Sequence, residues 1–301
     1  MKKATFFFLL LFFCFQSHGQ SYWQGMGLTF NQDPMCMYFD SVTEKSYLAG
    51  NFQIVNGDSV NIMVYDGNNF TAMPKAPIHS IRSIISYKSK IFVAGFGGLA
   101  SWDGNTWTWI DSISTFFNIE THGNKLYVMG WQNNNRVNLP ISAVIMWNDT
   151  VWTDLLGIDT VFGNWGGLVT DIEFYKGKVY VGGNWFNPSR PELHDLMVHD
   201  GISWKPVGYF GGDGMGGVHK FLVWRDTLYV AGMFLESPII PSNSIAAWDG
   251  AQWHRLQQGV RSNSTGGGAI SAMTIYNNEL WVEGVCFTSL MVGLLPLIMA
   301  M

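Results

Sequence analysis

Charged residues and cysteines are both scarce in this chain of 301 residues. Only 13% of the residues are charged, the formal net charge is −5, and there are 3 cysteines. So few cysteines exclude a disulfide-stapled scaffold, and a hydrophobic core must therefore hold the fold together. The acidic balance excludes the basic surface that nucleic-acid binding requires, so no nucleic-acid partner is expected.

Sustained helical periodicity is also absent, whereas glycine and aromatic residues are abundant. The chain contains 34 glycines, and 15% of its residues are aromatic, with 14 tryptophans among them. Glycine supplies the backbone angles of tight turns, and aromatic side chains supply large apolar areas for a core. This composition, without a helical pattern, favours an all-β protein with many short strands.

The first residues have the pattern of a secretory signal peptide. Two lysines precede an apolar run from Ala4 to Phe15, and the small residues Ser17 and Gly19 follow. The run is too short to span a bilayer, which takes about 20 apolar residues. We therefore expect residues 1–19 to be removed and the mature chain to be secreted or displayed on the cell surface, without a membrane-spanning helix.

Two short motifs recur along the rest of the chain. The first has alternating apolar residues and ends in a glycine, and it recurs at intervals of roughly 35 to 53 residues, the range of propeller blades. Its copies are KSYLAGNF from Lys45, KIFVAGFG from Lys90, KLYVMGWQ from Lys125, KVYVGGNW from Lys178, TLYVAGMF from Thr227 and ELWVEGVC from Glu279. The second motif places two aromatic residues around a turn, as YDGNNF from Tyr65, WDGNTW from Trp102, WNDTVW from Trp147, HDGISW from His199 and WDGAQW from Trp248.

Each repeat resolves into four short strands. A short apolar strand leads through a two-residue turn, such as Lys88-Ser89 or Asn277-Asn278, into the first motif. The second motif is the hairpin between the third and fourth strands, where Asp103-Gly104 is expected to supply the positive φ angles of a two-residue turn. Its paired aromatics are expected to pack between neighbouring sheets, although exposed indoles that stack on sugars would give the same sequence pattern.

The combined pattern, [LIV]-[YFW]-V-x-G followed by [WYH]-[DN]-G-x-x-[WF], resembles the kelch and galactose-oxidase-type β-propeller repeats of large secreted Bacteroidetes proteins. The resemblance covers residues 22–284 and implies an all-β propeller domain over residues 20–284 with about six four-stranded blades. The last blade is incomplete, and a lone strand at Tyr22–Gly27 is expected to complete it and close the ring. The copper ligands of galactose oxidase match no positions here, so no cofactor and no metal site are expected.

The segment after Gly284 departs from the repeat. Residues 285–301 form an apolar tail where a polar loop and another aromatic hairpin should follow. Gly293, Pro296 and the lack of a charged flank argue against a spanning helix, although a short anchor is an alternative. An interrupted reading frame or a truncated gene is the favoured interpretation.

Connections of variable length all fall on one face of the expected propeller. In a four-stranded blade, the connections from strand two to strand three and from one blade to the next leave the same edge. Loops on a rigid scaffold commonly carry recognition, although drift in unconstrained loops gives the same pattern. The candidate ligand contacts on this face are Trp131, Arg136, Trp165, Trp185, Phe186, Arg190, His194 and Arg261.

A second group of residues lies at or near the starts of the first strands. They are expected to gather around the mouth of the central channel on the same face. Both a catalytic pair, for example Asp171 with His219, and ordinary salt bridges are compatible with these residue types. The group comprises His79, Arg82, Asp171, Glu173, His219 and Lys220.

The motifs specify the fold far more than an activity, because propellers host many unrelated functions. The leading hypothesis is a secreted, non-enzymatic propeller that recognises an extracellular glycan or protein through its loop-rich face. A glycan-active enzyme, either a hydrolase, a lyase or an oxidase, is the first alternative. A fragment of a larger surface adhesin is the second.

Overall fold

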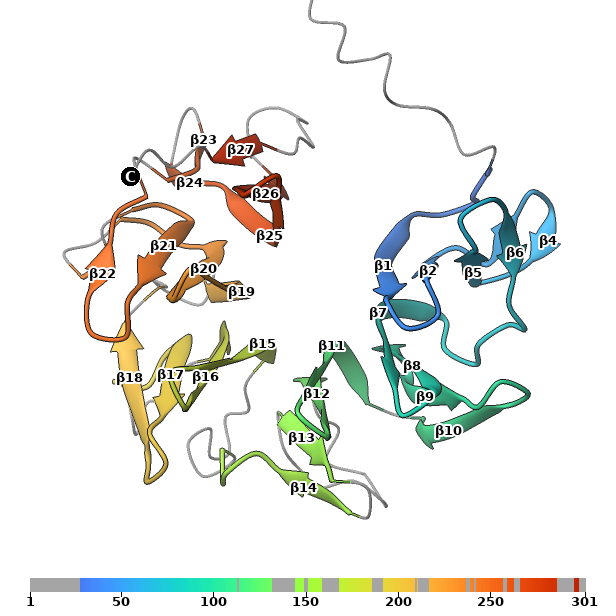
Figure 1. Ribbon diagram of the computed structural model, residues 1–301, viewed down its shortest axis with the longest axis horizontal. Helices are drawn as coiled ribbons and strands as arrows, with labels where there is room; N and C mark the ends of the chain where they lie inside the picture. The colour runs from blue at the N-terminus through green and yellow to red at the C-terminus, as the bar shows by residue number, and fades with distance from the viewer. Residues whose placement is uncertain are drawn as a thin grey trace, which may run out of the picture.

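The strands of the chain form sheets that surround a common centre (Figure 1). The computed structural model describes residues 28–112, 114–131, 144–148, 151–158, 168–185, 192–208, 210, 217–236, 239–240, 242–256, 259–262, 266–285 and 295–297. Within these ranges every regular element is a β-strand. A search of the same residues finds no helix long and apolar enough to cross a membrane.

Each blade is built from strands that follow one another along the chain and pair antiparallel, and blades 2 and 3 join into one sheet where Phe96 pairs with Thr115. Blade 1 contains β1 (Pro34–Asp40), β2 (Lys45–Gly50), β5 (Ile62–Tyr65) and β6 (Phe70–Ala72), with the hairpin of β3 (Ile54–Val55) and β4 (Asp58–Ser59) between β2 and β5. Blade 2 contains β7 (Ser80–Tyr87), β8 (Lys90–Phe96), β9 (Gly98–Trp102) and β10 (Trp107–Asp111). Blade 3 contains β11 (Thr115–His122), β12 (Lys125–Trp131), β13 (Val144–Trp147) and β14 (Trp152–Asp154).

The later blades repeat this order. Blade 4 contains β15 (Leu168–Tyr175), β16 (Lys178–Asn184), β17 (Leu196–His199) and β18 (Trp204–Gly208). Blade 5 contains β19 (Gly217–Trp224), β20 (Thr227–Met233), β21 (Ile245–Trp248) and β22 (Trp253–His254). After the small hairpin of β23 (Arg261–Ser262) and β24 (Gly266–Gly267), blade 6 contains β25 (Ala269–Tyr276), β26 (Glu279–Val285) and β27 (Leu295–Leu297).

The first strands β1, β7, β11, β15, β19 and β25 lie nearest the centre, and the later strands of each blade lie further out (Figure 1). This arrangement is a β-propeller, which confirms the predicted fold class. Strand β27 belongs to the segment 285–301 and pairs with β26 in the position of a third strand. The strand predicted at Tyr22–Gly27, and with it the predicted closure of the ring, lies outside the described residues.

The glycine that ends the first motif marks a close approach between two backbones. Each first strand has an irregular register near its start, opposite this glycine, as between Val218 and Lys220 in β19. A Cβ atom built on Gly232 would lie 2.1 Å from the carbonyl oxygen of Gly217. The same clash, with the backbone of the first strand, recurs at Gly50, Gly95, Gly130, Gly183 and Gly284. The repeat therefore keeps glycine because any side chain would push the two strands apart.

Gly232→Ala is expected to lower the free energy of unfolding by about 1 to 3 kcal/mol, the usual cost of overpacking a tight interior. Chemical denaturation followed by tryptophan fluorescence measures this. Gly208→Ala is the matched control, because its closest atoms belong to the side chains of Ile240 and Phe210, which can move. An unchanged denaturation midpoint for Gly232→Ala would contradict the close approach.

The turns between the first and second strands form as predicted. Lys88 and Ser89 have φ angles of 47° and 63°, and Asn277 and Asn278 have φ angles of 49° and 64°. Two successive positive φ angles are typical of the two-residue hairpins that match the twist of the strands.

The Asp-Gly hairpins differ from the prediction of a two-residue turn, which is wrong. Trp102 pairs directly with Trp107, so four residues make the connection, and only Gly104 has a positive φ angle, of 101°. The Asp103 carboxylate instead accepts hydrogen bonds from the backbone N–H groups of Asn105 and Thr106, at 2.9 and 2.8 Å. The aspartate is thus an acceptor that caps the turn, which is a common role of Asp in turns.

The paired aromatics of the second motif pack between blades, as predicted. The rings of Trp102 and Trp107 lie 5.3 Å apart, and Trp107 Nε1 donates to the Pro74 carbonyl, just beyond the last strand of blade 1. Trp204 donates in the same way to Leu156 beyond blade 3, and Trp253 donates to Val207 of blade 4. Each indole therefore contributes apolar contact and one hydrogen bond across a blade interface.

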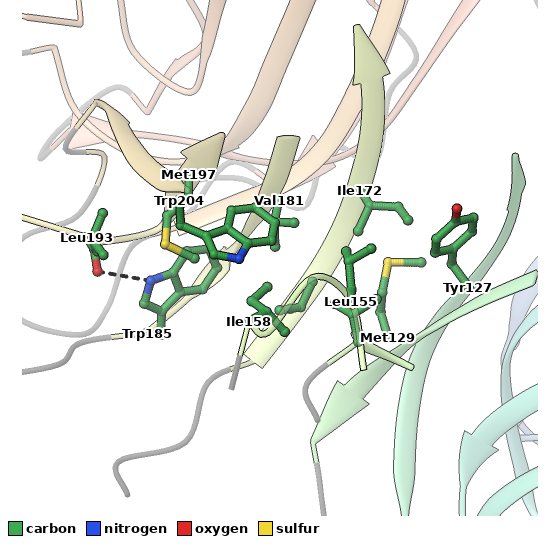
Figure 2. Packing of buried hydrophobic residues seen from close by; sticks show 12 residues of the cluster. Tyr127, Met129, Leu155, Ile158, Ile172, Val181, Trp185, Leu193, Met197 and Trp204 are labelled. Atoms are coloured by element: carbon green, nitrogen blue, oxygen red, sulfur yellow. Dashed lines mark hydrogen bonds between the residues drawn. The ribbon is translucent and has the colours of Figure 1, made fainter. Parts of the chain in front are cut away.

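The core consists of one cluster at each interface between successive described blades and a further cluster on blade 1, formed by Phe52, Val55, Val60 and Met63 with Leu28 and Phe30 packed against it. Figure 2 shows the cluster between blades 3 and 4, where Met129 and Leu155 face Ile172 and Val181. The ring of Trp185 closes this cluster, with only 4% of the residue exposed. Such layers explain the stability of a repeat fold, because each blade buries its face against its neighbour.

One face of blade 1 has no such neighbour among the described residues. Cys36 and Tyr38 pack toward blade 2, so the alternating Met37 and Phe39 point the other way, and they are 74% and 57% exposed. The residues at the position of Met37 in blades 2 to 5 are Ile84, Ile119, Ile172 and Phe221, and all four are buried. Figure 1 shows the described part of the ring open between blades 6 and 1.

Candidate functional site

Side chains from three blades meet at the central channel. Lys220 of β19 places its ammonium nitrogen 3.0 Å from both Glu120 Oε1 of β11 and Asp171 Oδ1 of β15. Asn118 of β11 donates to the same two oxygens, at 3.0 and 2.9 Å. The second oxygen of Asp171 accepts the backbone N–H of Phe221 at 2.7 Å. We call Asn118, Glu120, Asp171 and Lys220 the channel cluster.

The repeat itself brings the channel cluster together. Asn118, Asp171 and Lys220 each follow the register irregularity of their first strand, so they occupy one equivalent position in three successive blades. Glu120 lies two residues further along, on the same side of β11. Because neighbouring first strands lie side by side around the centre, equivalent positions face one another across the blade interfaces.

Burial controls the protonation of these groups. Burial raises the pKa of Asp171 well above its usual range, the Glu120 carboxylate raises it further, and the Lys220 ammonium opposes both effects. Burial alone would lower the pKa of Lys220, but the carboxylates of Asp171 and Glu120 raise it. Burial also raises the pKa of Glu173, in spite of the backbone N–H of Phe174 that its carboxylate accepts. The buried Asp171 carboxyl group therefore holds a proton more tightly than an isolated carboxyl group.

The channel cluster links neighbouring blades through ionic and hydrogen-bonded contacts and offers no obviously reactive group. Lys220 stays protonated, so it offers a fixed positive charge rather than a nucleophile or a base. The Asp171 carboxylate already accepts three hydrogen bonds and the residue is only 1% exposed, so it is poorly accessible to a substrate. In the part of the chain that the structure describes, no group of His, Cys, Asp and Glu residues could hold a metal ion.

The predicted channel-mouth residues divide into two groups. Asp171 and Lys220 come together, with Glu173 two residues beyond Asp171. His219 does not join Asp171, because its Nδ1 lies 3.1 Å from the Ile270 carbonyl oxygen of blade 6, and burial lowers its pKa. The pair of Asp171 with His219 that was considered for catalysis is therefore not formed.

The other two predicted mouth residues lie near the start of blade 2. The carbonyl oxygen of His79 accepts a hydrogen bond from the side chain of Gln53 at 2.6 Å. The guanidinium of Arg82 stacks over the ring of Phe96 at 4.8 Å from its centroid.

Sequence reasoning missed Asn118 and Glu120. The signal was present, since aligning the first strands by their repeats places FNIE of β11 over TDIE of β15. Equivalent positions in a propeller are spatial neighbours even when they are far apart in sequence.

The predicted loop-face contacts fall at several different places in the chain. Trp131 and Arg261 are described as backbone, at the ends of β12 and β23. Of the remaining candidates, His194 is partly exposed, whereas Trp185 is buried and its indole N–H donates to the Leu193 carbonyl at 3.1 Å (Figure 2). A further four lie outside the described residues: Arg136, Trp165, Phe186 and Arg190.

The two faces of the propeller differ in their connections. On one face the connections between second and third strands run over residues 51–61, 132–143, 185–195 and 234–244, and only blade 2 has a single residue, Gly97, there. On the opposite face every connection is a turn of two to four residues. In the described part of the loop face, the exposed apolar side chains include Ile54, Phe96, Leu235 and Ile239.

Comparison with known proteins finds solved structures of similar fold but no family. No family model matches the sequence, and no curated protein matches it. Solved structures do match. The extracellular domain of the hybrid two-component system BT3049 from B. thetaiotaomicron is 13% identical, with a TM-score of 0.55 over 84% of this chain and 32% of that one. The extracellular domain of the one-component system BT4673 from the same organism is 10% identical, with a TM-score of 0.56 over 86% of this chain and 31% of that one.

A third structure is matched along most of its own length. The β-propeller domain of the Trilobed protease from Pyrococcus furiosus is 14% identical, with a TM-score of 0.51, and the match covers 88% of this chain and 84% of that one. Identities this low show the shared propeller fold alone. The chain spans about a third of the length of the two B. thetaiotaomicron structures.

Proposed function

We propose that this chain is a secreted or cell-surface propeller module that binds an extracellular glycan or protein through its loop-rich face. The observation that carries this proposal is the asymmetry between the two faces. All of the long connections lie on one side, together with exposed apolar side chains such as Leu235 and Ile239, and the opposite side has only tight turns. Variable loops on a rigid scaffold are the usual location of a recognition surface.

The channel cluster supports a binding role better than an enzymatic one. Its lysine is held charged and its buried aspartate has both oxygens engaged, so the cluster fixes blades 3, 4 and 5 relative to one another. The propellers of similar shape include extracellular domains of B. thetaiotaomicron proteins, in accordance with the predicted signal peptide at residues 1–19. The resemblance to kelch and galactose-oxidase-type repeats supports the propeller fold and identifies no catalytic residue.

A module within a larger surface protein is the second candidate. It is favoured by the face of blade 1 that no other described blade covers, where Met37 is exposed at a position that blades 2 to 5 bury and Phe39 is exposed as well. Apolar side chains at such a position normally pack against a neighbouring blade. In this form of the proposal the loop face still binds the ligand, and blade 1 contacts further protein.

The test is a binding screen with variants on each face. We expect the mature chain to bind a component of a glycan array or a purified surface protein, and Leu235→Ser with Ile239→Ser to weaken that binding about tenfold. The reason is that apolar contacts at the centre of an interface carry most of its binding energy. Biolayer interferometry with the immobilised chain measures the change.

Val42→Ser with Ile202→Ser is the matched control, because these exposed apolar residues lie in turns of the opposite face. All variants should keep the wild-type melting temperature. Binding that survives the loop-face change and is lost with the control would contradict the proposal.

A further inference from the structure

A cationic side chain without a hydrogen-bond acceptor lies where blades 2 and 3 meet. Arg82 occupies the irregular register position of β7, and its Nε is buried without a hydrogen-bond partner. No carboxylate of the described residues forms an ion pair with it, in contrast to Lys220 in the neighbouring channel cluster. A buried donor that lacks an acceptor costs about 1–3 kcal/mol, so its retention calls for an explanation.

One aromatic ring lies against this cation, and a second ring packs against the first. The guanidinium carbon lies 4.8 Å from the centroid of Phe96, and the ring of Phe117 meets Phe96 edge-on at 6.0 Å between centroids. Phe96 ends β8 and pairs with Thr115 of β11, which places both rings at the junction of the two blades. Gly97 is the whole connection from β8 to β9, so this connection does not cover Phe96, and 42% of Phe96 is exposed.

We propose that Arg82, Phe96 and Phe117 form a subsite for a hexuronic acid residue of a glycan. This inference rests on the proposed binding function and assigns its substrate class. The planar guanidinium can donate two parallel hydrogen bonds to the two oxygens of a carboxylate, which is among the strongest arrangements of charge-assisted hydrogen bonds. The exposed face of Phe96 offers the flat apolar surface on which the C–H groups of a sugar ring pack.

The surroundings favour a sugar acid over an acidic peptide. Ser83, next to Arg82, hydrogen-bonds to Asn118 at 3.1 Å, which links the subsite directly to the channel cluster. That cluster has two carboxyl groups for one ammonium, and Glu173 adds another carboxyl group nearby. A flexible chain with several carboxylates would leave most of its charges unpaired there, because Arg82 is the single cation of the subsite, whereas a ring with one carboxylate and several hydroxyl groups presents its charge to Arg82 alone.

Isothermal titration calorimetry at low salt tests the subsite with two probes that differ only in the carboxylate, methyl β-glucuronide and methyl β-glucoside. We expect the wild-type chain to bind the glucuronide at least about tenfold more tightly, and higher salt to weaken this preference. Arg82→Gln should abolish the preference. Arg82→Lys keeps the positive charge but not the planar pair of donors, so it should retain only part of the preference for the glucuronide.

Arg225→Gln is the matched control, because Arg225 stacks over Trp224 at 4.3 Å on the opposite face and should leave the preference intact. The comparison of the two sugars on the wild-type chain needs no variant, so misfolding of Arg82→Gln does not remove the test. Equal affinity for the two sugars, failure to bind the glucuronide, or stronger binding of an acetylated glutamate dipeptide would each overturn the subsite. If the Leu235 and Ile239 variants still weaken binding of another ligand, only this inference fails, and if they do not, the proposed function fails with it.

Discussion

Lys220→Met is expected to lower the free energy of unfolding by about 3 kcal/mol at pH 7. Removing one partner of a buried ion pair costs about 3–5 kcal/mol, and Lys220 is partly exposed, which places it at the low end of that range. The variant leaves Glu120 and Asp171 facing each other without a cation. Urea denaturation followed by fluorescence measures the loss.

The defect should shrink as the pH falls. Without the ammonium, the two carboxylates raise each other's pKa in the folded chain above the values in the unfolded chain. The folded state then binds more protons than the unfolded state, so acidification from pH 7 toward pH 5 favours folding of the variant relative to the wild type. A defect of the same size at both pH values would show that charge repulsion is not its cause.

Two further variants distinguish the loss of charge at Lys220 from the loss of its packing. Lys90→Met removes an exposed lysine at the start of β8 and should change the stability by less than about 0.5 kcal/mol. Adding Glu120→Gln and Asp171→Asn to Lys220→Met removes the uncompensated carboxylates and should recover much of the loss, because neutral replacement of a whole buried network is tolerated. A triple variant that is weaker than Lys220→Met would sink the electrostatic explanation.

The sequence predicted the propeller well because each repeat has to solve the same local problems. In each blade a glycine of the second strand must lie against the first strand, as Gly232 does in blade 5. A tight turn must also connect the first strand to the second, as Lys88 and Ser89 do in blade 2. These needs are local, so they leave a periodic pattern that can be recognised without a structure. The Asp-Gly hairpin was assigned the wrong turn for a related reason, because Asp103 satisfies backbone N–H groups with its side chain and the letters D-G do not distinguish that role.

The candidate site was predicted less well because its contacts run between repeats. Asp171 and Lys220 were found as charged residues at strand starts, but Asn118 joined them only through the geometry of neighbouring blades. Arg82 was named as a mouth residue, yet nothing local showed that Phe96 would lie beneath it. Loop residues carry no periodic signal at all, so an aromatic residue in a loop looks the same whether it contacts a ligand or fills a gap in the core.

Trp185 is the sharpest case of that ambiguity, and Trp185→Ala is expected to lower the free energy of unfolding by about 3–5 kcal/mol. This is the usual cost of truncating a buried tryptophan, and it follows from the cavity left beside Ile158, Leu193 and Met197 (Figure 2). Trp185→Phe keeps a single aromatic ring, leaves a smaller cavity and loses the hydrogen bond to Leu193, so its cost should lie between about 1 kcal/mol and that of Trp185→Ala. Chemical denaturation measures both losses.

Trp109→Ala is the control, because Trp109 is an exposed tryptophan of β10 and its truncation should change the stability by less than about 0.5 kcal/mol. Ligand binding measured on the folded fraction of Trp185→Ala should then be near that of the wild type, since the indole lies in the interface between blades 3 and 4. A Trp185→Ala chain with the wild-type denaturation midpoint and no ligand binding would instead return Trp185 to the loop face as a contact residue. The two outcomes differ in both measurements, so a single variant distinguishes an aromatic residue that holds the blades together from one that binds a ligand.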